Sequence, residues 1–391
     1  MDNSKLDQIA AVQAMLVDGI YDDPIMEVYA QEARIEDDDN IHVLKAQCDP
    51  DTMYHHEAMK QPDKDEFKAA MTKEVKDQLN NETFEIVPRS SVPKGATIFP
   101  AVWQMRRKRD IKTGKIKKYK AKLNIDGSRM KRRRDFDLTY APVATWNVIR
   151  LVLMMVLINN WHTVQLEYIA TFPQAPIEKK LYMYIPKGMA IEDGDKKDYV
   201  LKLKRNLYGQ RQAGRVWNKY LVHKLTSKNM GFVQSKYDEC VFYKNGMVYI
   251  LYSDESIIAG PNKNKIDETV NLIQSVGLDI TIEGDLQDFL EININRQDDD
   301  TISMTQPLLF DKILTDLRLT QENVNIKTTP MASSRILFRH HKSQPHDDSF
   351  RYQSTVGKLN YLEKASRPDI AYAVHQCTRY SDDPKWNMEQ Q

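Results

Sequence analysis

Residues 248–259 read Val-Tyr-Ile-Leu-Tyr-Ser-Asp-Glu-Ser-Ile-Ile-Ala. Two apolar runs flank Tyr252-Ser253-Asp254-Glu255, which predicts a β-hairpin with two carboxylates at its tip. Paired acids on a rigid turn suit divalent cations, because hard cations prefer oxygen ligands held in a fixed place. A solvated turn is the alternative that this stretch leaves open, since acids are common in turns.

A third acid, Glu167, lies on a strand predicted at residues 163–168. If that strand neighbours the hairpin in one sheet, Glu167 lies beside Asp254. Carboxylates on adjacent strands suit two Mg²⁺ ions roughly 3.5–4 Å apart, with Mn²⁺ as a substitute. One ion would activate an attacking 3′-hydroxyl, and the other would neutralise charge on a leaving pyrophosphate.

The rest of the chain alternates short strands with helices. Hydrophobic periodicity predicts helices at residues 65–79, 147–158, 213–228, 265–276 and 308–317, and helical structure at 351–380 around a break at Arg367-Pro368. Strands are predicted at 83–87 and in two hairpins, 101–109 with 116–125 and 240–244 with 247–252, the second around Asn245-Gly246. This pattern predicts an α+β fold with a mostly antiparallel sheet.

Charge is unevenly distributed, although Lys plus Arg total 56 and Asp plus Glu total 55. Residues 106–134 are strongly basic, whereas the first 65 residues are acidic. A basic block in a neutral chain favours a polyanion partner, with a solvated hairpin as the alternative. Single, widely spaced cysteines are typical of a reducing intracellular setting, and the longest apolar run is too short for a bilayer.

Seven short motifs occur in a fixed order along residues 119–370: Tyr119-Lys120-Ala121-Lys122-Leu123, Tyr140-Ala141-Pro142-Val143, Gln165-Leu166-Glu167, Leu181-Tyr182-Met183, Leu207-Tyr208-Gly209-Gln210-Arg211-Gln212, Tyr252-Ser253-Asp254-Glu255 and Arg367-Pro368-Asp369-Ile370. Their order and spacing resemble the reverse transcriptase of copia-type LTR retrotransposons. The resemblance covers about residues 54–385. Each motif alone is weak, but the ordered set is specific.

The resemblance implies a right-hand polymerase within residues 53–330, with fingers at about 83–145, palm at about 146–295 and a thumb-like part at about 296–330. An acidic, poorly ordered leader (1–52) would precede it, and a linker and connection segment (331–391) would lead toward an RNase H domain. The implied protein is a template-directed DNA polymerase fragment of a retrotransposon polyprotein. Its partners would be an RNA or DNA template-primer and deoxynucleotide triphosphates, without a membrane, in the cytoplasm (a virus-like particle) or the nucleus.

The resemblance also implies residue roles. Glu167, Asp254 and Glu255 would be the catalytic metal ligands, and Phe172 would lie under the incoming sugar as a gate against a 2′-hydroxyl. The other nucleotide-binding residues would be Lys120, Lys122, Tyr208, Gly209 and Gln212, and template phosphate would bind Arg132, Arg133 and Arg134. The alternative for Lys120 and Lys122 is that they are ordinary exposed lysines of a strand. For Tyr208, Gly209 and Gln212 it is a turn that leads into a helix. For Arg132, Arg133 and Arg134 it is a solvated loop or a nuclear-localisation patch.

Four positions depart from the family pattern, and one of them is Lys122, where the family has Arg; Lys keeps the charge but loses bidentate phosphate geometry. The family has Asp where this chain has Glu167 and Glu255, and Phe-Leu-Gly where it has Phe289-Leu290-Glu291. An extra methylene moves a carboxylate by about 1 Å, which in a preorganised site can cost ~100-fold in rate. A carboxylate in place of the glycine would repel primer phosphate. Two functions therefore remain open: an active polymerase, or a degenerate remnant or host-adopted protein that only binds nucleic acid.

Overall fold

The computed structural model describes residues 51–109, 115–191, 194–299, 301–319, 329–331 and 350–381. Nearly all of the predicted acidic leader therefore lies outside the described residues, as do residues 332–349 and 382–391 of the predicted linker and connection segment. The chain forms two compact units. The first comprises residues up to Ala144 together with His162–Gly284, and the second comprises Thr145–Trp161 together with the residues from Asp285 onward.

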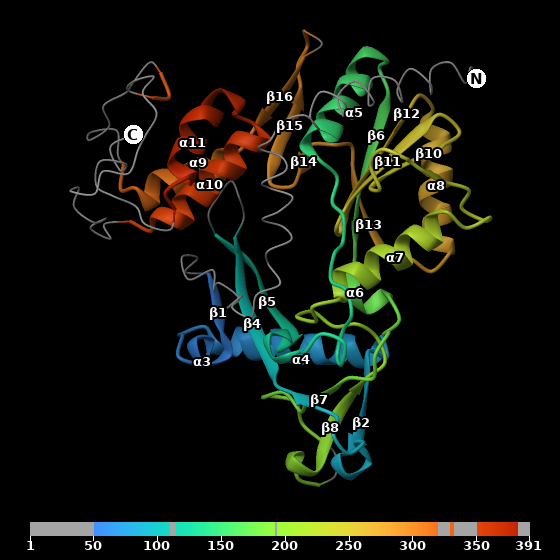
Figure 1. The fold of residues 1–391 in the computed structure, drawn as a ribbon, viewed down its shortest axis with the longest axis vertical. Helices are drawn as coiled ribbons and strands as arrows, with labels where there is room; N and C mark the ends of the chain where they lie inside the picture. The colour runs from blue at the N-terminus through green and yellow to red at the C-terminus, as the bar shows by residue number, and fades with distance from the viewer. Residues whose placement is uncertain are drawn as a thin grey trace. The chain divides into compact units, whose positions relative to one another are not determined.

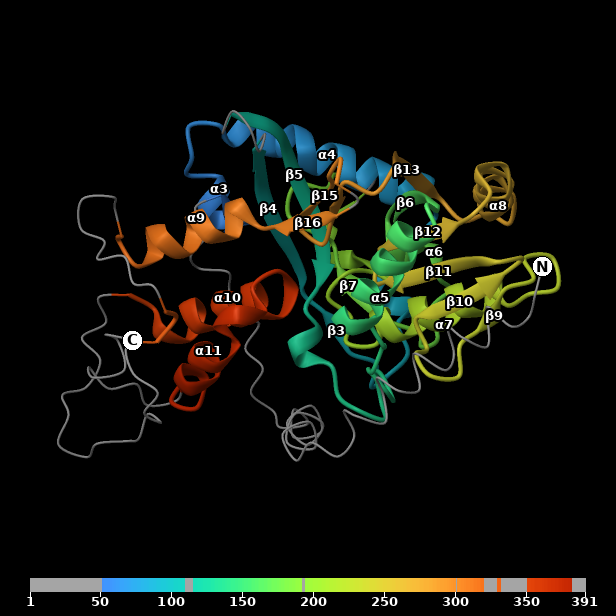
Figure 2. The same ribbon diagram turned by 90° about the horizontal axis from the view of Figure 1, so that it is seen from above.

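The predicted fingers hairpin is present in the first unit. Strands β4 (Ala101–Arg109) and β5 (Ile116–Ile125) pair antiparallel, and β1 (Thr52–Tyr54) adds to the other side of β4. Helix α4 (Lys64–Asn80) lies along β5 (Figure 2), after the short helix α3 (His55–Ala58). Phe67 of α4 is fully buried and meets the Tyr119 ring edge-on at 5.1 Å between centroids. The apolar stripe that predicted this helix is therefore its sheet-facing side.

A small sheet follows the order β2 (Phe84–Pro88), β8 (Tyr199–Leu203), β7 (Tyr182–Tyr184) and β3 (Ile98–Phe99). Only β2 was predicted as a strand. The short strands β3 and β7 pair in parallel, and their pairing joins residues 84 positions apart. One face of this sheet shares a hydrophobic core with the fingers hairpin. Three one-turn 3-10 helices, Arg89–Ser91, Gly127–Arg129 and Lys196–Asp198, connect the strands of this region.

The palm sheet has six antiparallel strands in the order β13 (Ile280–Gly284), β6 (His162–Tyr168), β12 (Glu255–Gly260), β11 (Met247–Tyr252), β10 (Val241–Lys244) and β9 (Val233–Gln234) (Figure 1). The strands β11 and β12 are almost wholly buried. Asn245 and Gly246 join β10 to β11 with φ angles of 49° and 77°, as the type I′ turn predicted for this dipeptide requires. The order puts the strand that bears Glu167 beside the acidic hairpin.

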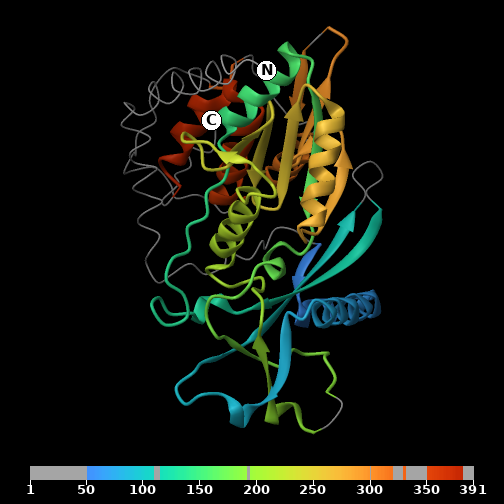
Figure 3. The same cartoon turned by 90° about the vertical axis from the view of Figure 1, so that its right-hand side faces the viewer.

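Helices support the palm sheet. Helix α8 (Lys263–Ser275) runs along the sheet (Figure 3) and buries Ile266, Val270 and Ile273. Helix α7 (Ala213–Leu225) ends three residues before its predicted end and buries Trp217 and Leu221. The one-turn helix α6 (Thr171–Gln174) follows β6 directly. No helix among the described residues has the length and apolarity needed to cross a membrane.

The second unit contains helices and one three-stranded sheet. Its elements are α5 (Trp146–Ile158), β14 (Asp288–Phe289), β15 (Ile292–Arg296), β16 (Ile302–Thr305), α9 (Pro307–Asp316), α10 (Tyr352–Ala365), a 3-10 turn (Pro368–Ile370) and α11 (Ala371–Thr378). Arg150 of α5 donates to the carbonyl oxygen of Ala365 at 3.1 Å. This contact explains why α5, predicted as part of the palm, groups with the C-terminal helices. The α+β class with mostly antiparallel sheets is as expected.

Candidate active site

The three predicted acids meet at one end of the palm sheet. Tyr252 pairs with Glu255 across the two-residue turn Ser253-Asp254, and Glu255 pairs in turn with Glu167 on β6. The Tyr168 N–H donates to the Asp254 carbonyl oxygen at 2.8 Å. The direct neighbour of Glu167 in the sheet is therefore Glu255, and Asp254 lies one position further, over the end of β6.

The side chains of these acids differ in exposure. Glu167 and Asp254 are exposed, and Glu255 is half-buried. Among the described residues, no three His, Cys, Asp or Glu side chains lie close enough together to hold a metal ion. The donor set itself fits a hard divalent cation, because it consists of accessible carboxylates on adjacent strands. The backbone thus brings the predicted ligands together, and the metal site stays a prediction.

A chain of buried hydroxyls lies between the strands that bear the acids. The hydroxyls of Tyr168 and Tyr249 are 2.6 Å apart, and Tyr249 donates to Ser256 Oγ at 2.8 Å. Burial raises the pKa of Tyr249 to about 12 and raises the pKa of Tyr168 well above its ordinary value, so both stay neutral. Because Tyr168 follows Glu167 and Ser256 follows Glu255, this network fixes β6, β11 and β12 at the acidic end of the sheet.

Two lysines of the fingers interact electrostatically with the acids of the palm. Lys122 interacts with Asp254, and Lys120 interacts with Glu167. Desolvation, with the nearby ammonium groups of Lys108 and Lys118, lowers the pKa of Lys120 to about 8. Burial also lowers the pKa of Lys122. The two lysines predicted to bind nucleotide therefore share one environment with the predicted metal ligands.

Aromatic residues line the same region. The Lys122 ammonium lies 3.3 Å from the centroid of the Tyr208 ring, a cation–π contact. The Tyr208 ring in turn packs against Phe172 at 4.9 Å, tilted by 51°. Phe172 lies in α6, the helix that follows the strand of Glu167. Ala170, the N-cap residue of α6, has a left-handed φ of 45° and makes the turn between the two elements. The structure thus brings together Lys122, Tyr208 and Phe172, three of the predicted nucleotide-binding residues.

Gly209 has a structural reason to be glycine. Its φ is +87°, and a Cβ built there would lie 2.2 Å from the Ile125 carbonyl oxygen. The Ile125 N–H donates to the Tyr208 carbonyl oxygen at 2.9 Å, so loop and strand lie in backbone contact. This backbone contact explains the glycine without any nucleotide. A nucleotide-binding role for Gly209 stays a prediction.

Two buried glutamines follow Gly209. Gln210 and Gln212 are 6% and 1% exposed, and both ends of each side-chain amide lack a hydrogen-bond partner among the described residues. Gln212 is also the N-cap residue of α7. A buried amide without a hydrogen-bond partner lowers the stability of the fold. Each of these glutamines is therefore a position where stability has been lost, either for a function or through a substitution in this chain.

Glu74 is a residue of this region that sequence reasoning missed. Strand β5 is an edge strand, and its Leu123 N–H donates to Glu74 Oε1 at 3.3 Å. Burial raises the pKa of Glu74, and Lys122 opposes that shift. The sequence did contain a signal for Glu74. It follows Phe67 by seven residues and Met71 by three, which places an acid inside the apolar stripe of α4. Glu74 and the Tyr208 carbonyl together close the exposed edge of the fingers hairpin.

Strand alternation divides the basic block into two faces. On one face, Arg107 Nε donates to Asp63 at 2.7 Å and Arg109 Nε donates to Asp51 at 2.6 Å. The Arg107 guanidinium lowers the pKa of Asp63 to about 2. The other face carries exposed cationic residues at paired positions: Arg106 opposite Lys120, and Lys108 opposite Lys118. The first face is structural, and only the second presents a basic surface.

The arginines at 132–134 form part of a tight exposed loop. Arg134 makes two hydrogen bonds to its neighbour Asp135, at 2.7 and 2.9 Å, and Arg132 Nε donates to the Asp137 carbonyl oxygen at 3.3 Å. Arg133 has a positive φ of 68°. These contacts support a locally fixed loop, and its binding of template phosphate stays a prediction.

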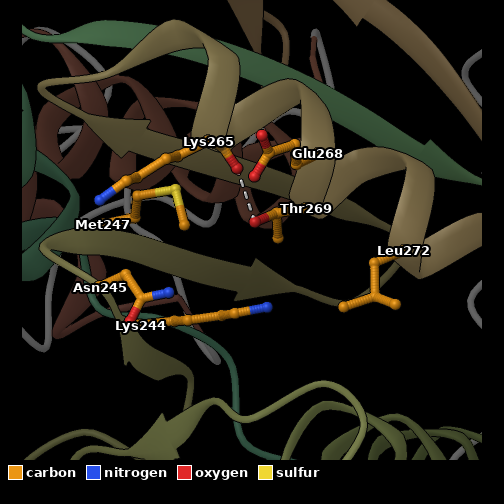
Figure 4. Close-up of a pocket in the computed structure, with 7 residues that line it drawn as sticks. All are labelled: Lys244, Asn245, Met247, Lys265, Glu268, Thr269 and Leu272. Atoms are coloured by element: carbon orange, nitrogen blue, oxygen red, sulfur yellow. Dashed lines mark hydrogen bonds between the residues drawn. The ribbon is translucent and has the colours of Figure 1, made fainter.

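A cavity of about 230 Å³ opens between α8 and the β10–β11 turn (Figure 4). It is lined by Lys244, Asn245, Met247, Lys265, Glu268, Thr269 and Leu272. Met247 begins β11, whereas Asp254 follows its end, so this cavity lies at the opposite end of the strand from the acids. It is separate from the candidate active site.

Comparison with known proteins gives a family match. The family described as reverse transcriptase (RNA-dependent DNA polymerase) matches residues 81–333, more than half of the chain. The retrovirus-related Pol polyprotein from transposon TNT 1-94 of Nicotiana tabacum is 28% identical over 84% of this chain and 25% of its own length. The corresponding polyprotein from transposon RE2 of Arabidopsis thaliana is 30% identical over 88% of this chain and 23% of its own length.

The chain spans about a quarter of the length of these curated relatives. A solved foamy viral protease–reverse transcriptase in complex with double-stranded DNA covers 81% of the chain and 44% of its own, with 12% identity and a TM-score of 0.40, a loose likeness. The family match confirms the resemblance to a retrotransposon polymerase and the fold class that it implied. The chain belongs to the reverse transcriptase (RNA-dependent DNA polymerase) family.

Proposed function

We propose that this reverse transcriptase domain adds deoxynucleotides to a primer 3′ end under the direction of a template, with Mg²⁺ or Mn²⁺ held by Glu167, Asp254 and Glu255. The observation that carries the proposal is the pairing of Glu255 with Glu167 beside the Asp254 turn. The electrostatic interaction of Lys120 and Lys122 with these acids supports it, because a triphosphate between them would meet cationic and metal-bound groups together.

Each side chain has a definite part in this proposal. Lys120 and Lys122 bind the triphosphate oxygens. Phe172 and Tyr208, whose rings pack at a tilt of 51°, support the sugar of the incoming nucleotide, and Phe172 excludes a 2′-hydroxyl. When bound, two divalent cations would supply activation of the 3′-hydroxyl and neutralisation of charge on the departing pyrophosphate. The acids orient that chemistry by fixing where the cations lie.

The longer acids set the expected rate. Glu167 and Glu255 each place the carboxylate one C–C bond further from the backbone than Asp would. A misplacement of about 1 Å can cost ~100-fold in a preorganised site. We therefore expect weak activity that is stronger with Mn²⁺, whose ligand geometry is the less demanding of the two.

A second function has its own supporting observation. The basic face at Arg106, Lys108 and Lys118 includes none of the three acids and would bind a nucleic-acid backbone even if catalysis were lost. The chain would then be a catalytically degenerate member of its family that only binds nucleic acid.

Primer extension on poly(rA)/oligo(dT) with Mg²⁺ or Mn²⁺ tests the first proposal. The full chain is compared with the Glu167→Asp, Glu255→Asp double variant and with Asp254→Asn as an inactive control. Extension by the full chain, increased about 100-fold or more in the double variant and absent in Asp254→Asn, supports it.

Two other outcomes decide against activity. Extension by the double variant alone identifies the natural chain as a degenerate polymerase. Salt-sensitive RNA binding by every variant without any extension supports the binding function, and its loss in a Lys108→Ala, Lys118→Ala variant would locate it on the basic face.

A further inference from the structure

The turn that carries Asp254 is fixed from outside its own hairpin. The Trp217 Nε1–H donates to the Ser253 carbonyl oxygen at 3.0 Å, and the Tyr168 N–H donates to the Asp254 carbonyl oxygen at 2.8 Å. Ser253 has a φ of 58°, the positive value that a two-residue hairpin turn requires at its first residue and that is costly for an L-residue other than Gly, Asn or Asp. Both carbonyls of the two-residue turn therefore have partners on other elements.

Trp217 is itself rigidly placed. It comes from α7, lies 36 residues before Ser253, and is 2% exposed. Its ring meets that of Tyr168 edge-on at 5.1 Å, the same Tyr168 whose N–H holds Asp254. A buried indole in this setting has one orientation, so its N–H direction is fixed.

Helix α7 also connects the turn to the nucleotide-binding loop. Gln212 is its N-cap residue, and Trp217 lies in its second turn. The loop that holds Tyr208 and the turn that holds Asp254 are thus anchored to one short, stiff helix. A shift of the helix would move both sides of the site together.

We propose that Trp217 is a positioning residue for the Asp254 carboxylate, acting through the Ser253 carbonyl. The inference rests on the proposed function in that Asp254 is taken as a metal ligand. Without the indole N–H, the Ser253 carbonyl loses its partner outside the hairpin, and the Asp254 carboxylate loses its fixed position. The nucleotide-binding side chains Lys122, Tyr208 and Phe172 keep theirs.

The test is Trp217→Phe, with Trp103→Phe as a matched control. Trp103 is also buried, 3% exposed, and its Nε1–H donates to a backbone carbonyl, that of Lys187, at 2.9 Å. Both variants lose the same donor and the same ring area. Only Trp217→Phe should speed amide exchange in a peptide covering residues 250–258, by roughly 5- to 10-fold, measured by hydrogen–deuterium exchange mass spectrometry.

Kinetic constants and metal binding distinguish a positioning role of Trp217 from a purely structural one. Trp217→Phe should lower kcat for primer extension about 10- to 100-fold while KM for the nucleotide stays within twofold. Mn²⁺ binding, followed by electron paramagnetic resonance, should weaken in Trp217→Phe and stay unchanged in Trp103→Phe. Should Trp217→Phe fail to fold, benzothienylalanine at position 217 removes the N–H and keeps the ring shape.

The proposal is overturned if exchange in residues 250–258 rises equally in both variants, or if kcat and KM change together. A chain that neither extends primers nor binds Mn²⁺ would defeat the proposed function alone. In that case the exchange experiment still decides: selective acceleration in Trp217→Phe supports the positioning role, and unchanged exchange refutes it.

Discussion

Glu255 lies directly opposite Glu167 in the antiparallel pairing of β12 with β6. Like charges at opposed positions of a sheet repel, at a cost of roughly 0.2–1 kcal/mol. A protein retains such a pair most readily where a cation compensates it. The pairing therefore predicts a link between metal binding and stability that does not depend on catalysis.

We expect Glu255→Gln to raise the free energy of unfolding in metal-free buffer by about 0.5 kcal/mol, because it removes the repulsion. Wild-type protein should gain stability with millimolar Mn²⁺, and the variant should gain much less, since it has lost a ligand. Thermal melts in EDTA and in MnCl₂ measure both effects. Glu283→Gln, the same charge change on β13, is the control, and an equal Mn²⁺ response in all three proteins would contradict the prediction.

Local sequence patterns predicted most of the residues of this site, but the register between strands far apart in the sequence could not be predicted. The hairpins at 101–125 and 240–252 follow from alternation and from Asn245-Gly246, which act over a few residues. Which acid lies opposite Glu167 depends on how β6 and β12 align. A shift of the pairing by one residue decides whether this acid is Asp254 or Glu255. The strands β3 and β7 escaped prediction because their pairing is parallel, very short and distant in sequence.

Gly209→Ala should be strongly destabilising because two effects add. The positive φ costs an alanine about 1 kcal/mol, and the new Cβ would overlap a backbone oxygen of Ile125 that cannot move freely. Gly95→Ala is the matched control, since Gly95 has the same φ of +87° and open space around it. Equilibrium urea unfolding should give a loss of about 1 kcal/mol for Gly95→Ala and at least about 2 kcal/mol more for Gly209→Ala. Equal losses would show that the loop–strand contact is not fixed.

Gln210→Leu should stabilise the fold by about 1–2 kcal/mol. Gln210 is 6% exposed, and both ends of its side-chain amide lack a hydrogen-bond partner among the described residues. The two side chains are close in volume, so the variant removes the polar group without leaving a void. Denaturant unfolding measures the gain, with the exposed Gln104→Leu as a control that should change little. A loss of stability would mean that water or another group satisfies the Gln210 amide.

Glu291→Gly should also stabilise the protein, by about 1 kcal/mol. Leu290 and Glu291 join β14 to β15 with φ angles of 54° and 60°, the left-handed pair of a type I′ turn. The glycine expected at 291 thus has a backbone reason, separate from the predicted approach of the primer. Glu291→Ala removes the charge but keeps the Cβ, so its melting temperature should stay near that of wild type. A gain from alanine equal to that from glycine would assign the effect to charge instead.

The lowered pKa of Lys120 predicts a pH dependence of nucleotide binding. At about 8, set by desolvation and by Lys108 and Lys118, this pKa lies within the working range of primer-extension assays. Only the protonated ammonium attracts a triphosphate, so KM for the nucleotide should be flat below pH 7 and rise about tenfold between pH 7 and pH 9. Lys120→Arg keeps its charge throughout, so its KM should not rise over the same range.

The same pKa gives a stability effect of opposite sign. The unfolded chain holds the Lys120 proton up to its ordinary pKa of about 10.5 and the folded chain only up to about 8, so the unfolded state binds more protons between these values. This residue's contribution to stability should therefore increase as pH rises from 8 to 10.5, while nucleotide binding weakens. Unfolding curves of wild type and Lys120→Arg at pH 7 and pH 9.5 separate the two effects. Parallel loss of binding and stability in wild type would place the titrating group elsewhere.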